Sequence, residues 1–252
     1  MPATRFLGKV ALLSGAGSGI GRATAVRLAA EGASVSCIDI SDDRLAETRQ
    51  LIEVAGGVAH TMVADVTVRD TCFTAVADCV AKFGRLDVLG NIAGIAWAEH
   101  FTEITEARYR QMMAVNVDGY FFLAQAAIPH LLASSGNIVN IASNAGLMGQ
   151  AYTVVYTMTK GAVVQLTKSL AMEYIKTPLR VNAIAPGGVH TNLTTGFQLP
   201  GDVDFDLMGR YTGFRGQGTP EDIAALFAFV ASDEAVNIHG AILSSDRGVT
   251  AG

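Results

Sequence analysis

Near its start the chain reads Ser14-Gly-Ala-Gly-Ser-Gly-Ile-Gly21, between an apolar run at residues 9–13 and a stretch of helical spacing at residues 20–30. Glycines let the backbone turn tightly and approach a pyrophosphate, and the N-terminus of the following helix offers unpaired N–H groups. Such a turn can also be only a tight strand-to-helix connection. Its position after the first strand of a β-α-β unit favours a dinucleotide site.

A carboxylate follows at the place where such a site needs one. Asp39 ends the next apolar run, at residues 34–39, 18 residues after Gly21. There it can accept both adenosine-ribose hydroxyls and repel a 2′-phosphate. The alternative is an aspartate that caps the next helix, but Ser41 can fill that role. Neither Ile40 nor Ser41 is basic, so the sequence favours NAD over NADP.

Short apolar runs alternate with helical segments along the rest of the chain. Helical spacing covers residues 42–55, and further strand-like runs lie at 58–64, 86–90, 137–141, 181–185 and near 241–244. This alternation predicts parallel pairing with helices on both faces of the sheet. We expect a single-domain, doubly wound α/β (Rossmann) fold of about seven strands over residues 1–252. The one long irregular stretch, at 186–219, suggests a lid or binding loop.

Composition excludes several classes of protein. The net charge of −5 argues against nucleic acid as a partner. No run approaches the roughly 20 apolar residues that span a bilayer, and residues 1–6 lack a secretory signal, so we expect a cytoplasmic protein without membrane contact. Cys37, Cys72 and Cys79 are odd in number and lack metal-type spacing, which favours reduced, buried thiols and no metal site.

One pair of side chains has the spacing of an acid–base site. Tyr156 and Lys160 are four residues apart and share a helix face. A nearby ammonium favours the phenolate, so such a tyrosine can exchange protons with an alcohol or carbonyl near neutral pH. A surface Tyr–Lys pair is the alternative. Tyr152 is a rival to Tyr156, but no lysine follows it four residues later.

Ser143 strengthens the catalytic interpretation. It follows the run at 137–141, at the carboxyl edge where open α/β sheets bind ligands. Its hydroxyl can orient and polarise a carbonyl oxygen.

Taken together, these motifs resemble the short-chain dehydrogenase/reductase family along essentially the whole chain. The family pattern T-G-x-x-x-G-x-G is matched at residues 14–21 with serine in place of threonine, and its Y-x-x-x-K pair at 156–160, with a serine 13 residues before the tyrosine. Its N-A-G element resembles residues 91–94, its helix asparagine is similar to Asn116, and its P-G-x-V-x-T segment resembles residues 186–191.

The resemblance implies a role for each matching residue. Tyr156 is expected to be the general acid/base, and Lys160 to bind the nicotinamide ribose and lower the tyrosine pKa. Ser143 is expected to hold the substrate oxygen, and Asn116 to anchor a water that links Lys160 to solvent. The other expected cofactor contacts are the turn (Gly15, Ser18, Gly19, Ile20, Gly21), Asp39 and Ile40, Asp65 and Val66 beside the adenine, Asn91, Ala93 and Gly94 along the cleft, and Pro186, Gly187, Val189 and Thr191 toward the nicotinamide.

Three positions depart from the family pattern. Ile92 stands where a second asparagine is common. Gly90 is unusual in its strand, and we expect it to loosen the packing there. Arg247 replaces a glycine in Asp246-Arg-Gly248, at an end of the chain that the family uses for subunit contacts, and it cannot adopt a positive φ as cheaply.

The substrate side is less defined by sequence. The 186–219 stretch is rich in apolar residues: Leu193, Phe197, Leu199, Phe205, Leu207, Met208, Tyr211 and Phe214. They suggest a lid over an apolar substrate, or equally a surface packed on the body or on a neighbour. With Ser143 and Tyr156, the expected substrate contacts are Trp97 and Gln150; Tyr152 is a further candidate. The hydrophobic stretches 118–132 and 153–175 correspond to the family's subunit contact and predict a homotetramer.

The sequence therefore predicts an NAD-dependent oxidoreductase that acts on a secondary alcohol or ketone, apolar or cyclic. Two alternatives remain open. One is a 3-oxoacyl-thioester reductase that uses NADPH, against which Asp39 counts. The other is a dinucleotide-binding sensor or structural protein that has lost catalysis, since fold alone does not fix function.

Overall fold

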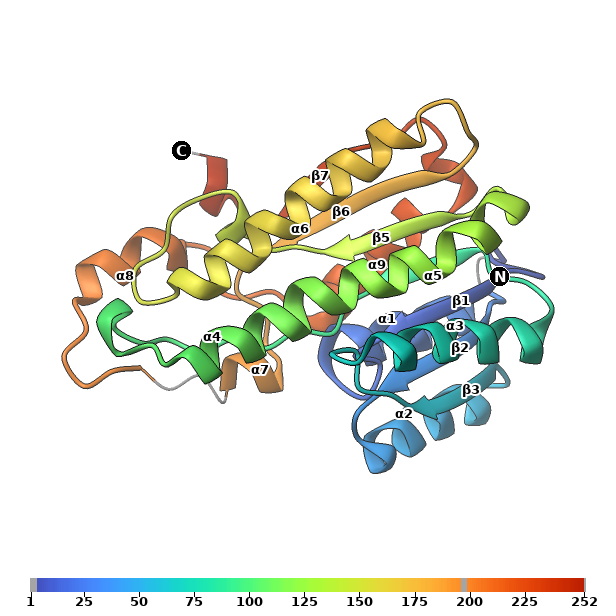
Figure 1. Ribbon diagram of the computed structural model, residues 1–252, viewed down its shortest axis with the longest axis horizontal. Helices are drawn as coiled ribbons and strands as arrows, with labels where there is room; N and C mark the ends of the chain where they lie inside the picture. The colour runs from blue at the N-terminus through green and yellow to red at the C-terminus, as the bar shows by residue number, and fades with distance from the viewer. Residues whose placement is uncertain (1–3, 196–198, 252) are drawn as a thin grey trace.

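Seven parallel strands form one sheet in the order β3-β2-β1-β4-β5-β6-β7 (Figure 1). The computed structural model describes residues 4–195 and 199–251. The strands are β1 Val10–Ser14, β2 Ser34–Asp39, β3 Val58–Val63, β4 Val88–Asn91, β5 Asn137–Ile141, β6 Arg180–Pro186 and β7 Ile242–Ser245. The predicted runs coincide with these strands to within two residues at each end, and the doubly wound α/β fold is confirmed.

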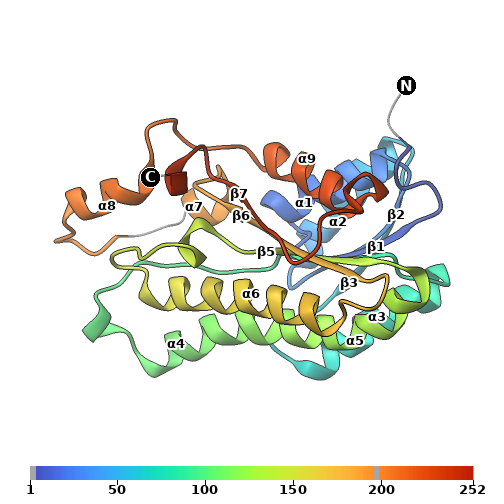
Figure 2. The same ribbon diagram turned by 90° about the horizontal axis from the view of Figure 1, so that it is seen from above.

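Helices cover both faces of the sheet. Figure 2 shows α1, α2 and α9 on one face and α3, α4, α5 and α6 on the other. Their bounds are α1 Gly19–Ala30, α2 Asp42–Val54, α3 Arg69–Phe83, α4 Glu106–Met113, α5 Gly119–Ser134, α6 Val154–Glu173 and α9 Pro220–Ala231. The strand order reverses between β1 and β4, and in such sheets the carboxyl edge at this switch point is where ligands bind.

The predicted irregular stretch at 186–219 contains two helices, α7 Asn192–Thr195 and α8 Phe205–Thr212. The expectation of a structureless loop is wrong for these parts. Asp204 caps α8 by accepting hydrogen bonds from the backbone N–H groups of Asp206 and Leu207. No residue of α8 is buried, and the helix lies at one end of the molecule, away from the sheet (Figures 1 and 2).

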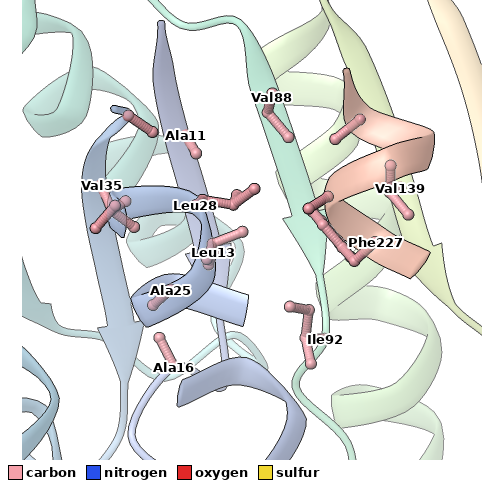
Figure 3. Close-up of a cluster of buried hydrophobic side chains, with 14 of the residues drawn as sticks. Ala11, Leu13, Ala16, Ala25, Leu28, Val35, Val88, Ile92, Val139 and Phe227 are labelled. Carbon is pink, nitrogen blue, oxygen red and sulfur yellow. The ribbon is translucent and has the colours of Figure 1, made fainter. Parts of the chain in front are cut away.

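Two large apolar clusters fix the sheet between its helix layers. Figure 3 shows one of them, in which Leu28 of α1 and Phe227 of α9 pack on β1 and β4. Gly90 belongs to this packing. A Cβ at Gly90 would overlap Leu13 and lie 2.9 Å from Cζ of Phe227. The prediction that Gly90 loosens its strand is therefore wrong, because the Phe227 ring occupies the space that a side chain would need.

Further expectations from the sequence concern a helix cap, a backbone angle, the cysteines and membrane-spanning helices. Ser41 caps α2 by accepting from the N–H of Arg44, and Arg247 adopts the predicted unfavourable φ of 55°. The three thiols are buried and free, and burial raises the pKa of Cys37 to about 12. Among the described residues, no helix combines the length and hydrophobicity needed to cross a membrane.

Candidate active site

The glycine turn contacts three other segments that the sequence assigned to the same site. A Cβ on Gly15 would lie 2.8 Å from Cα of Ala93, and one on Gly17 would lie 2.8 Å from Cγ of Asp39. A Cβ on Gly19 would lie 3.1 Å from Cγ2 of Thr191. Gly15 and Gly19 also have positive φ values of 64° and 52°, which glycine adopts without strain. The turn therefore gathers the ends of β2 and β4 and the segment after β6 at one edge.

Asp39 faces this turn rather than the helix that follows it. Its Oδ2 accepts a hydrogen bond of 3.1 Å from the N–H of Gly17, and its Oδ1 accepts one of 3.1 Å from the N–H of Ser41. Ser41, not Asp39, caps α2. The next side chain, Ile40, is 71% exposed beside the carboxylate.

The N-terminus of α1 has the properties that a pyrophosphate requires. Of the described side chains, none caps this terminus, and the first turn of α1 contains no acidic residue. By contrast, α2 begins with a side-chain cap and two aspartates, Asp42 and Asp43. An uncapped helix N-terminus with a glycine turn attracts anionic groups, so these residues fit a dinucleotide.

No sequence pattern indicates that Arg22 takes part in the turn. Its Nη2 donates to the carbonyl of Gly17 at 2.5 Å and pairs with Glu47 at 2.6 Å. The guanidinium thus holds the turn through the carbonyl of Gly17, and Glu47 neutralises its charge.

Ser143 and Gln150 meet through Asn144. Ser143 caps the short helix η3, Asn144–Gly146, and accepts from the N–H of Ala145 at 3.1 Å. Its Oγ donates to Oδ1 of Asn144 at 3.2 Å, and Nε2 of Gln150 donates to the same oxygen at 3.2 Å. Two expected substrate contacts therefore belong to one hydrogen-bonded group after β5.

Tyr156 lies in the first turn of α6, partly exposed beside Ser143. Burial raises the pKa of its phenol, while hydrogen bonding with the Ser143 side chain opposes the rise. The four-residue spacing predicts that Lys160 lowers this pKa. In the structure the shift is upward, because removal of the phenol from water outweighs the other influences.

Lys160 is buried at the bottom of the site, 3% exposed. Its Nζ donates to the carbonyl of Ile141 at 2.8 Å and lies 5.8 Å from the centre of the Tyr156 ring. Burial lowers the pKa of this ammonium to about 7. The predicted Tyr–Lys pair therefore lies on one helix face, with the lysine buried and the tyrosine partly exposed, and is not a surface pair.

Asn116 joins the loop after β4 to α6. It lies in a π-helical turn, η2 Ala114–Asp118, a rare geometry that is frequent at functional sites. Its amide accepts from the N–H of Ile95 and donates to the carbonyl of the same residue, both at 2.9 Å, and also donates to Oγ1 of Thr159 at 3.1 Å. A Cβ on Gly94 would lie 3.4 Å from Oδ1 of Asn116 and 3.7 Å from Nζ of Lys160.

Some expected cofactor residues lie in the interior. The side chain of Asn91 is fully buried and donates to Oδ1 of Asn140 at 2.9 Å, so the predicted contact with a cofactor would come from its backbone. Val66 packs in the apolar cluster on the α3 and α5 face. Val189 is buried and forms an isolated parallel β-bridge with Gly218.

The other expected contacts lie nearer to solvent. Asp65 is exposed, and its Oδ1 accepts from the N–H of Thr67 at 2.9 Å. Pro186 is the last residue of β6, and Gly187 follows it. A Cβ on Gly187 would lie 2.9 Å from Cα of Asp246, so there is no space for a side chain at this position.

Trp97 belongs to a cluster that sequence patterns did not reveal. The guanidinium of Arg108 lies 4.5 Å from the Trp97 ring and pairs with Oε1 of Glu99 at 2.7 Å. Trp97, Glu99, Tyr152 and Tyr156 line one small pocket. Oε2 of Glu99 is buried there without a hydrogen-bond partner among the described residues.

The segment that carries α8 is tied to this region by polar contacts. The Tyr152 hydroxyl accepts from the N–H of Asp204 at 2.8 Å, and the Tyr211 hydroxyl donates to the carbonyl of Ala151 at 3.0 Å. His100 contacts Asp202 at 2.7 Å. The Tyr152 hydroxyl is therefore already hydrogen-bonded to the segment that carries α8. The described apolar residues that stay exposed in this segment are Leu193, Leu199, Phe205, Leu207 and Phe214; Phe197 lies outside the described residues.

Comparison with known proteins places these observations in a family. The model described as enoyl-(acyl carrier protein) reductase matches residues 15–250. The chain is 39% identical to the cis-4-hydroxycyclohexanecarboxylate dehydrogenase of Sinomonas cyclohexanicum, over 98% of both chains. It is 35% identical to the 3-oxoacyl-[acyl-carrier-protein] reductase FabG of Thermotoga maritima, over 97% of this chain and 99% of the relative.

A solved structure also has this fold. The short chain dehydrogenase from Mycobacterium paratuberculosis bound to NAD superposes with a TM-score of 0.89, at 32% sequence identity, over 98% of this chain and 100% of the other.

Proposed function

Because this chain belongs to the short-chain dehydrogenase/reductase family, whose members bind a nicotinamide dinucleotide and act on alcohols and ketones, we propose that it transfers a hydride between NAD(H) and an apolar or cyclic secondary alcohol or ketone. The observation that carries the proposal is the grouping of Ser143, Tyr156 and Lys160 at the carboxyl edge of the sheet, beside Gly94 and the glycine turn.

The protein's own residues supply orientation and proton transfer. The bound cofactor supplies the hydride chemistry. The Ser143 hydroxyl holds the substrate oxygen, and the Tyr156 phenol gives it a proton during reduction or takes one during oxidation. Lys160 holds the nicotinamide ribose and stabilises the phenolate, and Asn116 anchors the water that links Lys160 to solvent.

The raised pKa of Tyr156 sets the expected pH dependence. A phenol whose pKa is raised keeps its proton through neutral pH, so it is ready to donate to a ketone. The proton on Tyr156 should therefore remain available for ketone reduction through neutral pH and be lost only as pH rises through the pKa of Tyr156, where alcohol oxidation should increase. Initial rates in both directions from pH 6 to above pH 10, the ordinary pKa of a phenol, test this; a reduction rate that rises across the range contradicts it.

Replacement of Tyr156 by phenylalanine tests the mechanism. Removal of a general acid/base costs about 10²–10⁴-fold in turnover. We expect Tyr156→Phe to lose turnover to that degree and to bind NADH nearly as well as the parent, with Tyr174→Phe at the far end of α6 as the control. Turnover retained in Tyr156→Phe would exclude the mechanism.

Asp39 supports NAD as the cofactor. Its carboxylate lies beside Gly17, where it can accept the ribose hydroxyls and repel a 2′-phosphate. The NAD-bound relative from Mycobacterium paratuberculosis agrees with this choice. Fluorescence titrations with NADH and with NADPH should give tighter NADH binding. In Asp39→Asn the affinities for NADH and NADPH should be closer to each other than in the parent protein. Tighter NADPH binding by the parent protein would overturn the assignment and favour the 3-oxoacyl-thioester reductase alternative that the FabG relative suggests.

The substrate class rests on the surroundings of Tyr156 and on a relative. Trp97 lies in the pocket beside Tyr156, and Gln150 in the Ser143 group. We propose that the exposed apolar residues of the 186–219 segment act as a lid over the substrate. The relative from Sinomonas cyclohexanicum is named for a cyclic alcohol. A panel of cyclic, linear and steroid alcohols followed by NADH absorbance tests the class. Turnover of none of them, with NADH bound, would favour a non-catalytic dinucleotide-binding protein.

The outer faces of α5 and α6 support a homotetramer. Phe121 of α5 and Met158 and Met172 of α6 are at least 48% exposed. Such apolar side chains on two long helices are typical of a surface covered by a second copy. Light scattering should give about four times the chain mass of 26.3 kDa; a monodisperse 26.3 kDa species would refute the assembly.

A further inference from the structure

Tyr120, in the first turn of α5, is buried against Lys160, although no sequence motif marked it. It is 1% exposed. Nζ of Lys160 donates to the Tyr120 hydroxyl at 3.5 Å and lies 5.3 Å from the centre of its ring. The Tyr120 hydroxyl donates in turn to the carbonyl of Ile141 at 3.1 Å, the same oxygen that accepts from Lys160. The three groups form a closed hydrogen-bonded set at the end of β5.

The π-helical turn before α5 sets up this contact. Asn116 and Tyr120 are four residues apart, and they contact the consecutive residues Thr159 and Lys160 of α6. The Tyr120 ring packs in a small apolar cluster with Val163 and other residues of α6 and β6, which fixes its orientation. The hydroxyl therefore reaches Lys160 from a rigid support.

The ammonium of Lys160 depends on neutral partners for its charge. Among the described residues, no carboxylate pairs with it, and Asp118, the acid of η2, is exposed. The titratable side chains that face it are Tyr120 from α5 and Tyr156 from its own helix. A buried charge without a counter-ion is stabilised by hydrogen-bond acceptors and aromatic faces, here the Ile141 carbonyl, the Tyr120 oxygen and the two rings.

We propose that Tyr120 is a positioning residue for Lys160, whose phenol oxygen and ring hold the lysine head group in its charged form beside Tyr156. The proposal rests on the proposed function only in that Lys160 assists Tyr156. The structural part, support of the charged lysine, stands on the contacts themselves.

The variant Tyr120→Phe isolates the hydroxyl, because it keeps the ring and its packing. Loss of one acceptor destabilises the charged form, so the Lys160 pKa should fall by about one unit. The chain has five lysines, Lys9, Lys82, Lys160, Lys168 and Lys176, so ¹³Cε-lysine NMR can follow Lys160 directly, with Lys160→Arg for assignment. Tyr120→Leu, which also removes the ring, should shift the titration further.

The control is Thr24→Val, which removes a buried hydroxyl from α1. Thr24 is fully buried, and its Oγ1 has no partner among the described residues. We expect the Lys160 titration to be unchanged in this variant. The fall in kcat that follows loss of the Lys160 ammonium lies at lower pH than the fall set by Tyr156. In Tyr120→Phe it should move to lower pH by the same amount as the Lys160 titration, since the ammonium is lost earlier as pH rises.

The two measurements separate the proposal from the function on which it rests. An unchanged Lys160 titration in Tyr120→Phe overturns the positioning role, whether turnover falls or not. A lowered Lys160 pKa with an unchanged kcat profile supports the positioning role and contradicts the assistance of Tyr156 by Lys160. A lowered pKa with the matching shift in kcat supports both.

Discussion

The glycine turn at residues 14–21 and the α8 segment at residues 199–214 follow strands at the same edge of the sheet, yet they are held in opposite ways. In the turn, each of Gly15, Gly17 and Gly21 leaves no room for a Cβ against protein atoms. In α8 no residue is buried, and a Cβ on Gly209 would meet no atom within 4 Å. Close packing fixes the first region, and a few polar contacts fix the second.

The two regions suit the two binding tasks of the proposed site. A region fixed by packing presents its N–H groups and carboxylate in one geometry before any ligand arrives, which suits a cofactor that all members of the family share. A region held by exposed hydrogen bonds opens at low free-energy cost, which suits a substrate that must enter and leave.

The largest expected effect is in the turn. A Cβ on Gly21 would overlap the carbonyl oxygen of Gly15, so Gly21→Ala must displace the backbone. Overpacking of this kind costs about 2–3 kcal/mol, which corresponds to about 30–140-fold in NADH affinity if the turn cannot relax. Calorimetric titration with NADH measures the loss.

Gly209→Ala in α8 is the matched control. Alanine is about 1 kcal/mol better than glycine inside a helix, and the space at Gly209 is open. NADH affinity should be unchanged and the helix more stable. Equal losses of NADH affinity in Gly21→Ala and Gly209→Ala would break the contrast between the two regions.

A smaller effect is expected from two acids, one at the end of the helix that follows the turn and one in the α8 segment. Burial raises the pKa of Glu31, at the end of α1, but hydrogen bonds from Arg5 and Arg27 outweigh it, and the pKa is lowered. The pKa of Asp202 is also lowered, chiefly by its contact with His100, but this side chain is 84% exposed. Glu31→Gln should therefore cost about 2 kcal/mol of stability at pH 7, and Asp202→Asn should cost nothing measurable.

The pH dependence of these variants has a definite sign. A carboxylate with a lowered folded-state pKa stabilises the protein above its ordinary pKa, 4.5 for Glu31, and this contribution is lost as pH falls through the lowered value. Urea denaturation should show a gap between parent and Glu31→Gln that is full at pH 7 and shrinks below pH 4.5. A gap that is constant from pH 7 to pH 3 would contradict the assignment.

The same contrast explains how much of the molecule could be predicted. The strands, Asp39 and the Tyr156–Lys160 pair follow from local patterns, because each depends on residues close in sequence. Gly90 was misjudged because its partner, Phe227, is 137 residues away. The inward side chain of Asn91, the π-helical turn at Asn116 and the unpartnered oxygen of Glu99 likewise depend on tertiary contacts. The α8 helix was missed because it is short and has no fully buried residue; only Met208 and Tyr211, three residues apart, are partly buried on one face.

The smallest expected effect concerns the contact that anchors the α8 segment. Tyr152 has a φ of 64°, an uncommon conformation for a side chain of its size, and its hydroxyl accepts from the N–H of Asp204. Tyr152→Phe removes this acceptor from an exposed site, where one hydrogen bond contributes about 1 kcal/mol, or about fivefold in an opening equilibrium. Hydrogen exchange at the Asp204 amide should be about fivefold faster, with exchange in α1 unchanged. Tyr109→Phe on α4 is the control. Exchange that is unchanged at Asp204 would show that packing, not this polar contact, holds the segment, and the two regions would then differ less than their burial suggests.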